Sequence, residues 1–412
     1  MISSLRARGF RWLWMGQLLS QWGSAVFLVM GFWEIQLKAP FLLGVAGIAM
    51  ALPQLLAVVG GVVVDRLDAG RVMFWTDVIR GTAVALALVW LLFRPGAHLW
   101  IIMGVLTVNS LGNALFGPAE AVAVPNLVLD QDLPSANGLY ALTSQLSQAI
   151  GSGIGGAAIA AVGISLVFGI DMASFWFSAL AIFMMMISSK SLEVNKNLGE
   201  PHSGSFRVMV SEGWRALSRM HWVIVLLPLI LLTNFTFAGG LILLPYWMRH
   251  DLHSTALWYG VTEGAWSLGM LGGSMAARWL GRWPLRKTIS VLGVTQGIIM
   301  ALFALSHVPW ESVLALFFGG ICNGSTNALI MTLFQRLIPE SVRGRAFGLL
   351  ITMVTAATPL AMGVAGLSIA VIPTVWWYLA MAVTDVMFGV GLWRVAPSET
   401  RMEGQSVTAN QS

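Results

Sequence analysis

The sequence predicts an all-α polytopic membrane protein with twelve transmembrane helices. Of its 412 residues, 57% are hydrophobic and only 10% are charged, whereas soluble domains carry roughly 25% charged residues. Apolar runs of the length that crosses a bilayer, about 20 residues, follow one another almost from end to end. None of these runs alternates apolar and polar residues as the strands of a transmembrane β-barrel do, so helices are expected throughout.

Twelve apolar runs are separated by short polar segments. They cover residues 10–35, 42–64, 73–93, 99–123, 136–162, 165–188, 222–247, 255–277, 288–306, 312–334, 346–371 and 374–393. The first run follows Arg6, Arg8 and Arg11, which is also how a secretory signal begins. The run is too long for a signal core, and no small-residue cleavage site follows it. We therefore interpret it as an uncleaved first transmembrane helix.

The basic residues predict how the helices are oriented. With the N-terminus in the cytoplasm and the loops alternating sides, 19 of the 23 Lys and Arg residues fall in cytoplasmic segments. These are Arg6, Arg8, Arg11, Arg66, Arg71, Lys190, Lys196, Arg207, Arg215, Arg219, Arg278, Arg282, Arg286, Lys287, Arg336, Arg343, Arg345, Arg394 and Arg401. Cytoplasmic loops of membrane proteins are enriched in basic residues, so both termini are expected in the cytoplasm. The net charge of +5 is dispersed over loops, which favours this explanation over nucleic-acid binding.

The longest polar stretch divides the chain into two halves of six spans each. The expected domains are an N-terminal six-helix bundle (1–188), a cytoplasmic linker (189–221), a C-terminal six-helix bundle (222–393) and a cytoplasmic tail (394–412). Phe206, Met209, Val210, Trp214 and Leu217 recur at helical spacing in the linker. This spacing favours an amphipathic helix on the inner membrane surface. The alternative is a solvated linker with a helical tail.

The two halves resemble each other. Asn-x-x-x-Asn-Ala-Leu occurs at 109–115 and again at 323–329, an offset of 214 residues, and ANGL at 136–139 is answered by AFGL at 346–349. Matches in the same order at a nearly constant offset indicate a duplicated six-span unit, as transporters often have. A glycine series in the fifth span, at positions 151, 153, 155 and 156, predicts a tight helix crossing.

Repeated amides are the first candidates for a substrate cavity. Each repeat places two Asn residues four positions apart, on one helix face, and a similar polar stripe lies on the first span. The cavity candidates are Gln17, Gln21, Trp22, Asn109, Asn113, Glu120, Asn323 and Asn327. Uncharged amides in membrane spans also join helices through hydrogen bonds. Both roles stay open for each pair.

Acidic residues inside the spans are candidates for proton coupling, because a charge within the bilayer is costly. Glu263 has no basic residue within a helical turn. An acid without a cationic partner in a low dielectric can take up and release a proton near neutrality, although a hydrogen-bonded packing role is the alternative. Glu120 and Glu34 are the next candidates. Asp77 and Arg80, three residues apart, are expected to neutralise each other.

Enzyme signatures such as GxxxxGK[ST], HExxH, CxxC and GxSxG do not occur in the sequence. We therefore expect no catalytic residues and no cofactor. His250 and His253 form an HxxH pair with no evident third ligand, so no metal site is expected. Cys322 is the single cysteine and has no partner for a disulfide within the chain.

One loop carries a recognisable signature. In GGVVVDRLDAGR, between the second and third spans, Gly61, Asp65, Arg66 and Arg71 follow the pattern Gly-x-x-x-Asp-Arg-x-x-x-x-Arg. Through this loop and the stretches FRWLWMGQLLSQWG, FGPAEAVAVPNLV and GRAFG, the chain resembles the major facilitator superfamily over essentially its full length. Within that superfamily it resembles the branch of enterobactin exporters and macrolide-efflux proteins. Ala277 stands where a second copy of Asp65 would be.

The resemblance implies the major facilitator fold and a secondary active exporter of small amphipathic compounds, of drug or siderophore type, in the bacterial cytoplasmic membrane. It also implies alternating access, antiport with protons, a monomer among membrane lipids, and a latch at Gly61, Asp65, Arg66 and Arg71 that closes the cytoplasmic side. It places Asp171 and Asp385 at the periphery of the bundles. IGSGIGG resembles an antiporter signature, with Ser152 in place of its proline. The alternatives are a nutrient importer or facilitator, and a membrane sensor or lipid-handling protein.

Overall fold

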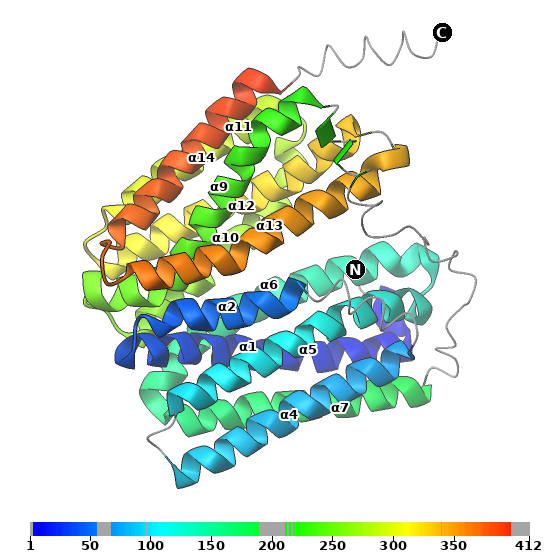
Figure 1. Cartoon of the computed structure of the whole chain (residues 1–412). Helices are drawn as coiled ribbons and strands as arrows, with labels where there is room; N and C mark the ends of the chain where they lie inside the picture. The colour runs from blue at the N-terminus through cyan, green and yellow to red at the C-terminus, as the bar shows by residue number, and fades with distance from the viewer. Residues whose placement is uncertain are drawn as a thin grey trace.

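Twelve α-helices account for most of the computed structural model of the chain (Figure 1). The structure describes residues 3–55, 67–94, 98–188, 211, 214–215, 217–218, 220–338 and 340–396. The helices are α1 (Arg8–Lys38), α2 (Leu42–Leu55), α4 (Ala69–Phe93), α5 (His98–Leu127), α6 (Leu133–Val162), α7 (Ile164–Ser188), α9 (His221–Tyr246), α10 (Ala256–Leu280), α11 (Leu285–Ala304), α12 (Pro309–Leu337), α13 (Glu340–Ser368) and α14 (Val375–Val395). Each expected span corresponds to one helix, and the described residues form no strand. The all-α prediction with twelve helices is confirmed.

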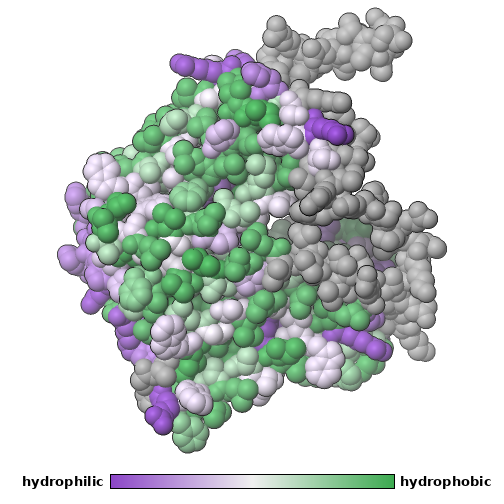
Figure 2. Space-filling view, in the orientation of Figure 1, coloured by the Kyte–Doolittle hydropathy of each residue, from purple (hydrophilic) through white to green (hydrophobic). Residues whose placement is uncertain are grey.

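Nine of the helices in the described part of the chain are long and apolar enough to cross a membrane. The exceptions are α2, of which 14 residues are described, α6 and α10. Both α6 and α10 are rich in Gly and Ser, and the two helices pack closely against each other. Figure 2 shows the apolar side chains spread over the face of the molecule, with hydrophilic ones gathered mainly toward its edges.

The helices form two bundles in chain order, α1 to α7 and α9 to α14 (Figure 1). In the first bundle α1 packs against α6 and α7, and α4 packs against α5 and α7. In the second, α10 packs against α12, and α11 against both α12 and α14. The bundles contact each other mainly through two helix pairs, α6 with α10 and α2 with α13. The expected architecture of two six-helix bundles is confirmed.

Glycines let these two helix pairs touch backbone to backbone. A Cβ added to Gly366 of α13 would lie 2.2 Å from the Cα of Gly44 in α2, and one added to Gly260 of α10 would lie 2.3 Å from the carbonyl oxygen of Ser152 in α6. A Cβ on Gly156 would lie 2.4 Å from the carbonyl oxygen of Ala256. The tight crossing predicted from the glycines of the fifth span is confirmed at this contact. At Gly366, Gly260 and Gly156 the neighbouring backbone therefore leaves no room for a side chain.

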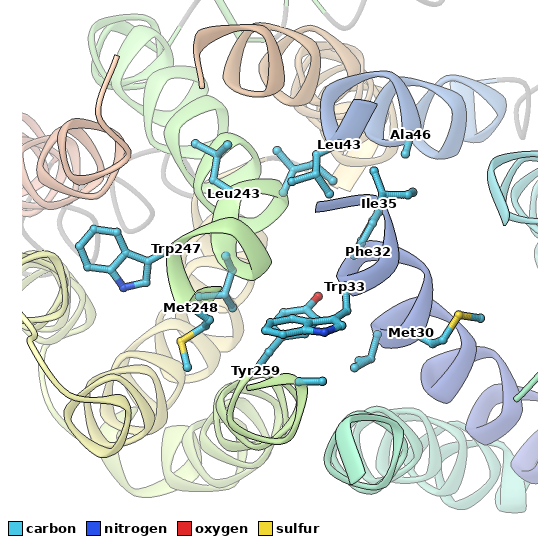
Figure 3. Close-up of a cluster of buried hydrophobic side chains, with 14 of the residues drawn as sticks. Met30, Phe32, Trp33, Ile35, Leu43, Ala46, Leu243, Trp247, Met248 and Tyr259 are labelled. Carbon is cyan, nitrogen blue, oxygen red and sulfur yellow. The ribbon is translucent and has the colours of Figure 1, made fainter. Parts of the chain in front are cut away.

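Among the residues that the structure describes, the bundles share a hydrophobic core at one end. A single cluster there joins α1 and α2 to α9 and α10, and it includes Leu43, Leu243 and Met248 (Figure 3). In the same cluster, the ring of Trp33 stacks on Tyr259 with centroids 6.0 Å apart. At the opposite end each bundle has its own core, around Phe10 in the first and around Leu226 and Leu217 in the second. We call the end with the shared core the closed end, and the end with the separate cores the open end.

Candidate substrate cavity

A cavity of about 670 Å³ lies in the second bundle beside its boundary with the first. Helices α9, α10, α12, α13 and α14 line most of it, and Gln145 and Gln148 of α6 contribute from the other bundle. Its wall combines amide and hydroxyl groups with apolar and aromatic side chains, among them Trp266 and Phe237. Sites for small molecules are typically concave and mostly apolar, with a few placed polar groups. The cavity has this character.

A second cavity of about 230 Å³ lies inside the first bundle and is more polar. Its lining includes Gln17, Gln21, Ser24, Gln54, Arg80, Asn109, Asn113, Ser144 and Gln148. Gln148 borders both cavities. The two hollows therefore adjoin at α6, one polar and one largely apolar.

The repeated amides line these cavities and also form hydrogen bonds. The Asn327 Nδ2 donates to the Asn323 Oδ1 over 2.8 Å on the wall of the large cavity. On the wall of the small one, the Asn113 Oδ1 accepts from Arg80 over 2.9 Å, and the Asn109 Nδ2 lies 3.4 Å from the Asp171 Oδ2. Asn109 and Asn113 therefore line a cavity and also join α5 to α7 and α4, whereas the hydrogen bond between Asn323 and Asn327 lies within α12.

The remaining cavity candidates divide into two groups. Gln17 and Gln21 line the small cavity, and the Gln17 Nε2 lies 3.4 Å from the hydroxyl of Ser178 as a hydrogen-bond donor. Trp22 lies against Gly151 of α6, and Glu120 lies on α5 beyond the amides. Neither Trp22 nor Glu120 is among the described residues that line the two cavities.

Asp77 and Arg80 form a buried ion pair. The Arg80 Nη1 lies 3.4 Å from the Asp77 Oδ1, and Ser178 donates to the other carboxylate oxygen over 2.6 Å. The guanidinium also faces the rings of Phe116 and Phe175, with centroids 5.7 and 5.4 Å away. A buried charge is tolerated only when it is paired and hydrogen-bonded. The ion pair lies within α4, and its hydrogen bonds to Ser178 of α7 and Asn113 of α5 join α4 to its neighbours.

Glu263 lies on the wall of the large cavity, where a small apolar pocket lined by Phe237, Trp266 and Tyr378 opens from it. Within the described part of the chain, its carboxyl group has no hydrogen bond and no ion pair. Glu34, by contrast, lies at the closed end, 3.9 Å from the His98 Nε2, and lines neither cavity.

Asp385 is a cavity residue that sequence reasoning missed. Its helix, α14, is peripheral in the bundle, but the side chain lines the large cavity and accepts a hydrogen bond from the Gln296 Nε2 over 3.0 Å. One signal in the sequence points to it. Asp171 and Asp385 are 214 residues apart, the same offset as the repeated amides.

Of the latch candidates, Gly61, Asp65 and Arg66 lie outside the described residues. Arg71 is exposed in the first turn of α4. Asp68, in the same charged loop, has a local role, because its Oδ1 accepts a hydrogen bond from the Arg71 backbone N–H over 2.7 Å. Asp68 therefore caps the N-terminus of α4.

The lining amides are expected to be reachable from water. Asn109, Asn113, Asn323 and Asn327, each changed to Cys in a Cys322→Ser background, are expected to react with small polar thiol reagents added at the open end. The native Cys322 is buried, but it must be removed because its thiol lies directly beside Asn323 in the chain. Labelling is measured by mass shift in a protein that still transports. Lack of reaction at all four positions would mean that the amides only join helices.

Comparisons with known proteins agree with this architecture. The family model described as "Transmembrane secretion effector" matches residues 1–401. The chain belongs to this family of major facilitator transporters. The resemblance read from the sequence is therefore confirmed, and both family and fold are those of membrane transporters, which are not enzymes.

Relatives and solved structures cover most of the chain. The MFS-type transporter YfiS of Bacillus subtilis is 25% identical over 77% of this chain and 76% of its own. The multidrug efflux pump Tap of Mycolicibacterium fortuitum is 26% identical over 78% and 79%, and macrolide efflux protein A of Streptococcus pyogenes is 22% identical over 86% and 87%. A bacterial homologue of ferroportin superposes with a TM-score of 0.66 in its inward-facing state and 0.57 in its outward-facing state with soaked iron. The inward-facing chain is 16% identical, over 94% of this chain and 98% of that one.

Proposed function

We propose that this protein is a secondary active exporter of small amphipathic compounds, which it moves by rocking its two bundles about the adjoining cavities. The observation that carries the proposal is the asymmetry of the bundle contacts. The bundles share one core at the closed end and have separate cores at the open end, and the two cavities adjoin at α6, beside the boundary between the bundles. A transporter that alternates access needs such a site, reachable from one side at a time.

The charges of the chain support an orientation. The basic residues that place the termini in the cytoplasm precede α1 and follow α10, α12 and α14, at the end where the cores are separate. With the open end in the cytoplasm, the structure corresponds to an inward-facing state. The higher TM-score to the inward-facing ferroportin homologue than to its outward-facing state supports this assignment.

Export rather than import is favoured by the relatives. Tap is named as a multidrug efflux pump, and the Streptococcus protein as a macrolide efflux protein. The lining also suits amphipathic compounds, because the first bundle offers amides and hydroxyl groups and the second offers aromatic walls. We further propose that protons drive the export, and that Glu263 carries the proton. A monomer is sufficient, because one chain supplies both cavities.

Flux in proteoliposomes tests the proposal. Purified protein is reconstituted, a pH gradient is imposed, and movement of a panel of fluorescent amphipathic compounds is followed. We expect transport against the substrate gradient that stops when an uncoupler is added. Movement in the import direction, coupled to the same gradient, would favour the nutrient-importer alternative. A complete lack of flux across the panel would favour the sensor or lipid-handling alternative.

The latch is proposed to act on the conformational equilibrium. Asp65→Asn is expected to reduce transport strongly without reducing membrane insertion. Losing about 1–2 kcal/mol from one of two states changes their ratio by about five- to thirty-fold. The matched control is Asp68→Asn, which removes a charge from the same loop but keeps a residue that caps helices well. Initial transport rates, normalised to the amount of protein in the membrane, are the measurement. Normal transport by Asp65→Asn would contradict the latch.

A further inference from the structure

The large cavity has an unbalanced set of charges. Two acids, Glu263 and Asp385, are among the described residues that line it, and no Lys, Arg or His is among them. The small cavity of the first bundle, by contrast, has a basic residue in its wall, Arg80. A wall with two acids and no basic residue favours a ligand that brings a positive charge.

Of the two acids, Asp385 is the one whose carboxyl group is held in a fixed orientation by a hydrogen bond. Its side chain is 3% exposed and that of Gln296 is 5% exposed. The Gln296 Nε2 donates to the Asp385 Oδ2 over 3.0 Å, and this contact orients the carboxyl group. The second carboxylate oxygen has no hydrogen bond within the described part of the chain. It is available to a ligand in the cavity that Asp385 lines.

The corresponding acid of the first bundle, Asp171, has a basic partner that Asp385 lacks within the described part of the chain. Asp171, the counterpart of Asp385 at the 214-residue offset, accepts from Asn109 and Ser24 over 3.4 Å each. It also interacts electrostatically with Arg80. Position 294, at the same offset from Arg80, is a valine. The first bundle therefore supplies a cation for its acid from within the protein, and the second does not.

Aromatic side chains complete the site. Phe237, Trp266, Phe334, Phe347 and Phe388 line the same cavity as Asp385. The faces of aromatic rings attract cations and also accept flat apolar groups, so the wall suits both parts of a lipophilic cation. A neutral amphipath would gain the apolar contacts but leave the carboxylate unpaired.

We propose that Asp385 binds the positively charged group of the substrate, and that the transported compounds include monovalent lipophilic cations such as protonated amines. This inference rests on the proposed function, because it takes the large cavity as the transport site. Asp385 holds the cation through its free carboxylate oxygen, Gln296 fixes the carboxylate, and the aromatic wall surrounds the apolar body of the ligand. Glu263 remains available for proton exchange.

Binding of tetraphenylphosphonium, a permanent lipophilic cation, tests the inference. The full chain in lipid nanodiscs is titrated by calorimetry with this cation and with neutral triphenylphosphine oxide. We expect the cation to bind, and Asp385→Asn to weaken its binding by about tenfold or more, which is the effect of about 1.4 kcal/mol. Binding of the neutral compound is expected to change little in the same variant.

Two further variants make the outcome decisive. Asp171→Asn neutralises the counterpart acid, which lines neither cavity, and is expected to leave cation binding unchanged. Asp385→Glu keeps the charge and is expected to retain binding. Equal cation binding by Asp385→Asn and the unmodified protein would overturn the inference, as would equal losses in Asp385→Asn and Asp385→Glu. Since binding is measured without flux, a protein that binds the cation but moves nothing contradicts only the proposed function. One that exports neutral compounds and binds no cation contradicts only the inference.

Discussion

Gly260→Val is expected to abolish transport by preventing the closed end from closing. The backbones of α6 and α10 touch at this glycine, and even a Cβ would lie 2.3 Å from the carbonyl oxygen of Ser152 and 2.9 Å from the backbone nitrogen of Gly156. The neighbouring atoms are backbone atoms of a helix and cannot rotate away. The two helices must therefore separate, which opens the closed end and removes the inward-facing state from the cycle.

Accessibility at the closed end measures this effect. Leu43, fully buried in the shared core, is changed to Cys in a Cys322→Ser background and treated with a membrane-impermeant thiol reagent from outside. We expect slow labelling with Gly260 present and fast labelling with Gly260→Val. Gly272→Val is the matched control, since it lies on the same helix and a Cβ there meets nothing within 4 Å. Slow labelling and normal flux in the Gly260→Val protein would show that the crossing tolerates a side chain.

Glu263→Gln is expected to abolish export against a gradient while downhill exchange and substrate binding continue. If protons drive export, an acid must alternate between charged and neutral forms as access changes sides. Glu263 meets the structural requirements, because it reaches the cavity and has no cationic partner within the described part of the chain. Asp77 does not meet these requirements, because it forms an ion pair with Arg80. The glutamine keeps the shape of the side chain but cannot carry a proton.

Proteoliposome flux with and without an imposed pH gradient separates the two activities. For Glu263→Gln we expect the internal and external substrate concentrations to equalise but not to diverge when the gradient is imposed. Glu263→Asp keeps an acid at the same position and is expected to retain part of the uphill transport. If Glu263→Gln still concentrates substrate, Glu263 is a packing residue, and Glu120 or Glu34 becomes the next residue to test.

The helices were predictable because each leaves a long apolar run, and even the tight crossing of α6 follows from its glycines. Contacts between helices that are distant in the sequence were not predictable. Nothing in the local sequence pairs Trp33 with Tyr259 or Gly44 with Gly366, because these contacts depend on how the two bundles dock. The amides of the cavity walls were found through their repeat. The peripheral position of α14 gives no sign that Asp385 lines the cavity, yet its side chain does so beside Gln296 of α11, and only the register of α14 decides that.

In the orientation proposed above, the shared core at the closed end affects how readily an exported compound can re-enter the cell through the protein. Opening that end brings large apolar side chains such as Leu43, Trp33 and Tyr259 into contact with water, and exposing one such side chain costs about 1.5–3 kcal/mol. In the proposed orientation, this cost favours the state of the empty molecule in which the open end faces the cytoplasm. Compounds outside the cell meet a sealed surface for most of the time, so re-entry through the carrier is slow even when a compound is abundant outside. On this proposal, a loaded molecule must break these apolar contacts in every cycle before it can release a compound outside the cell.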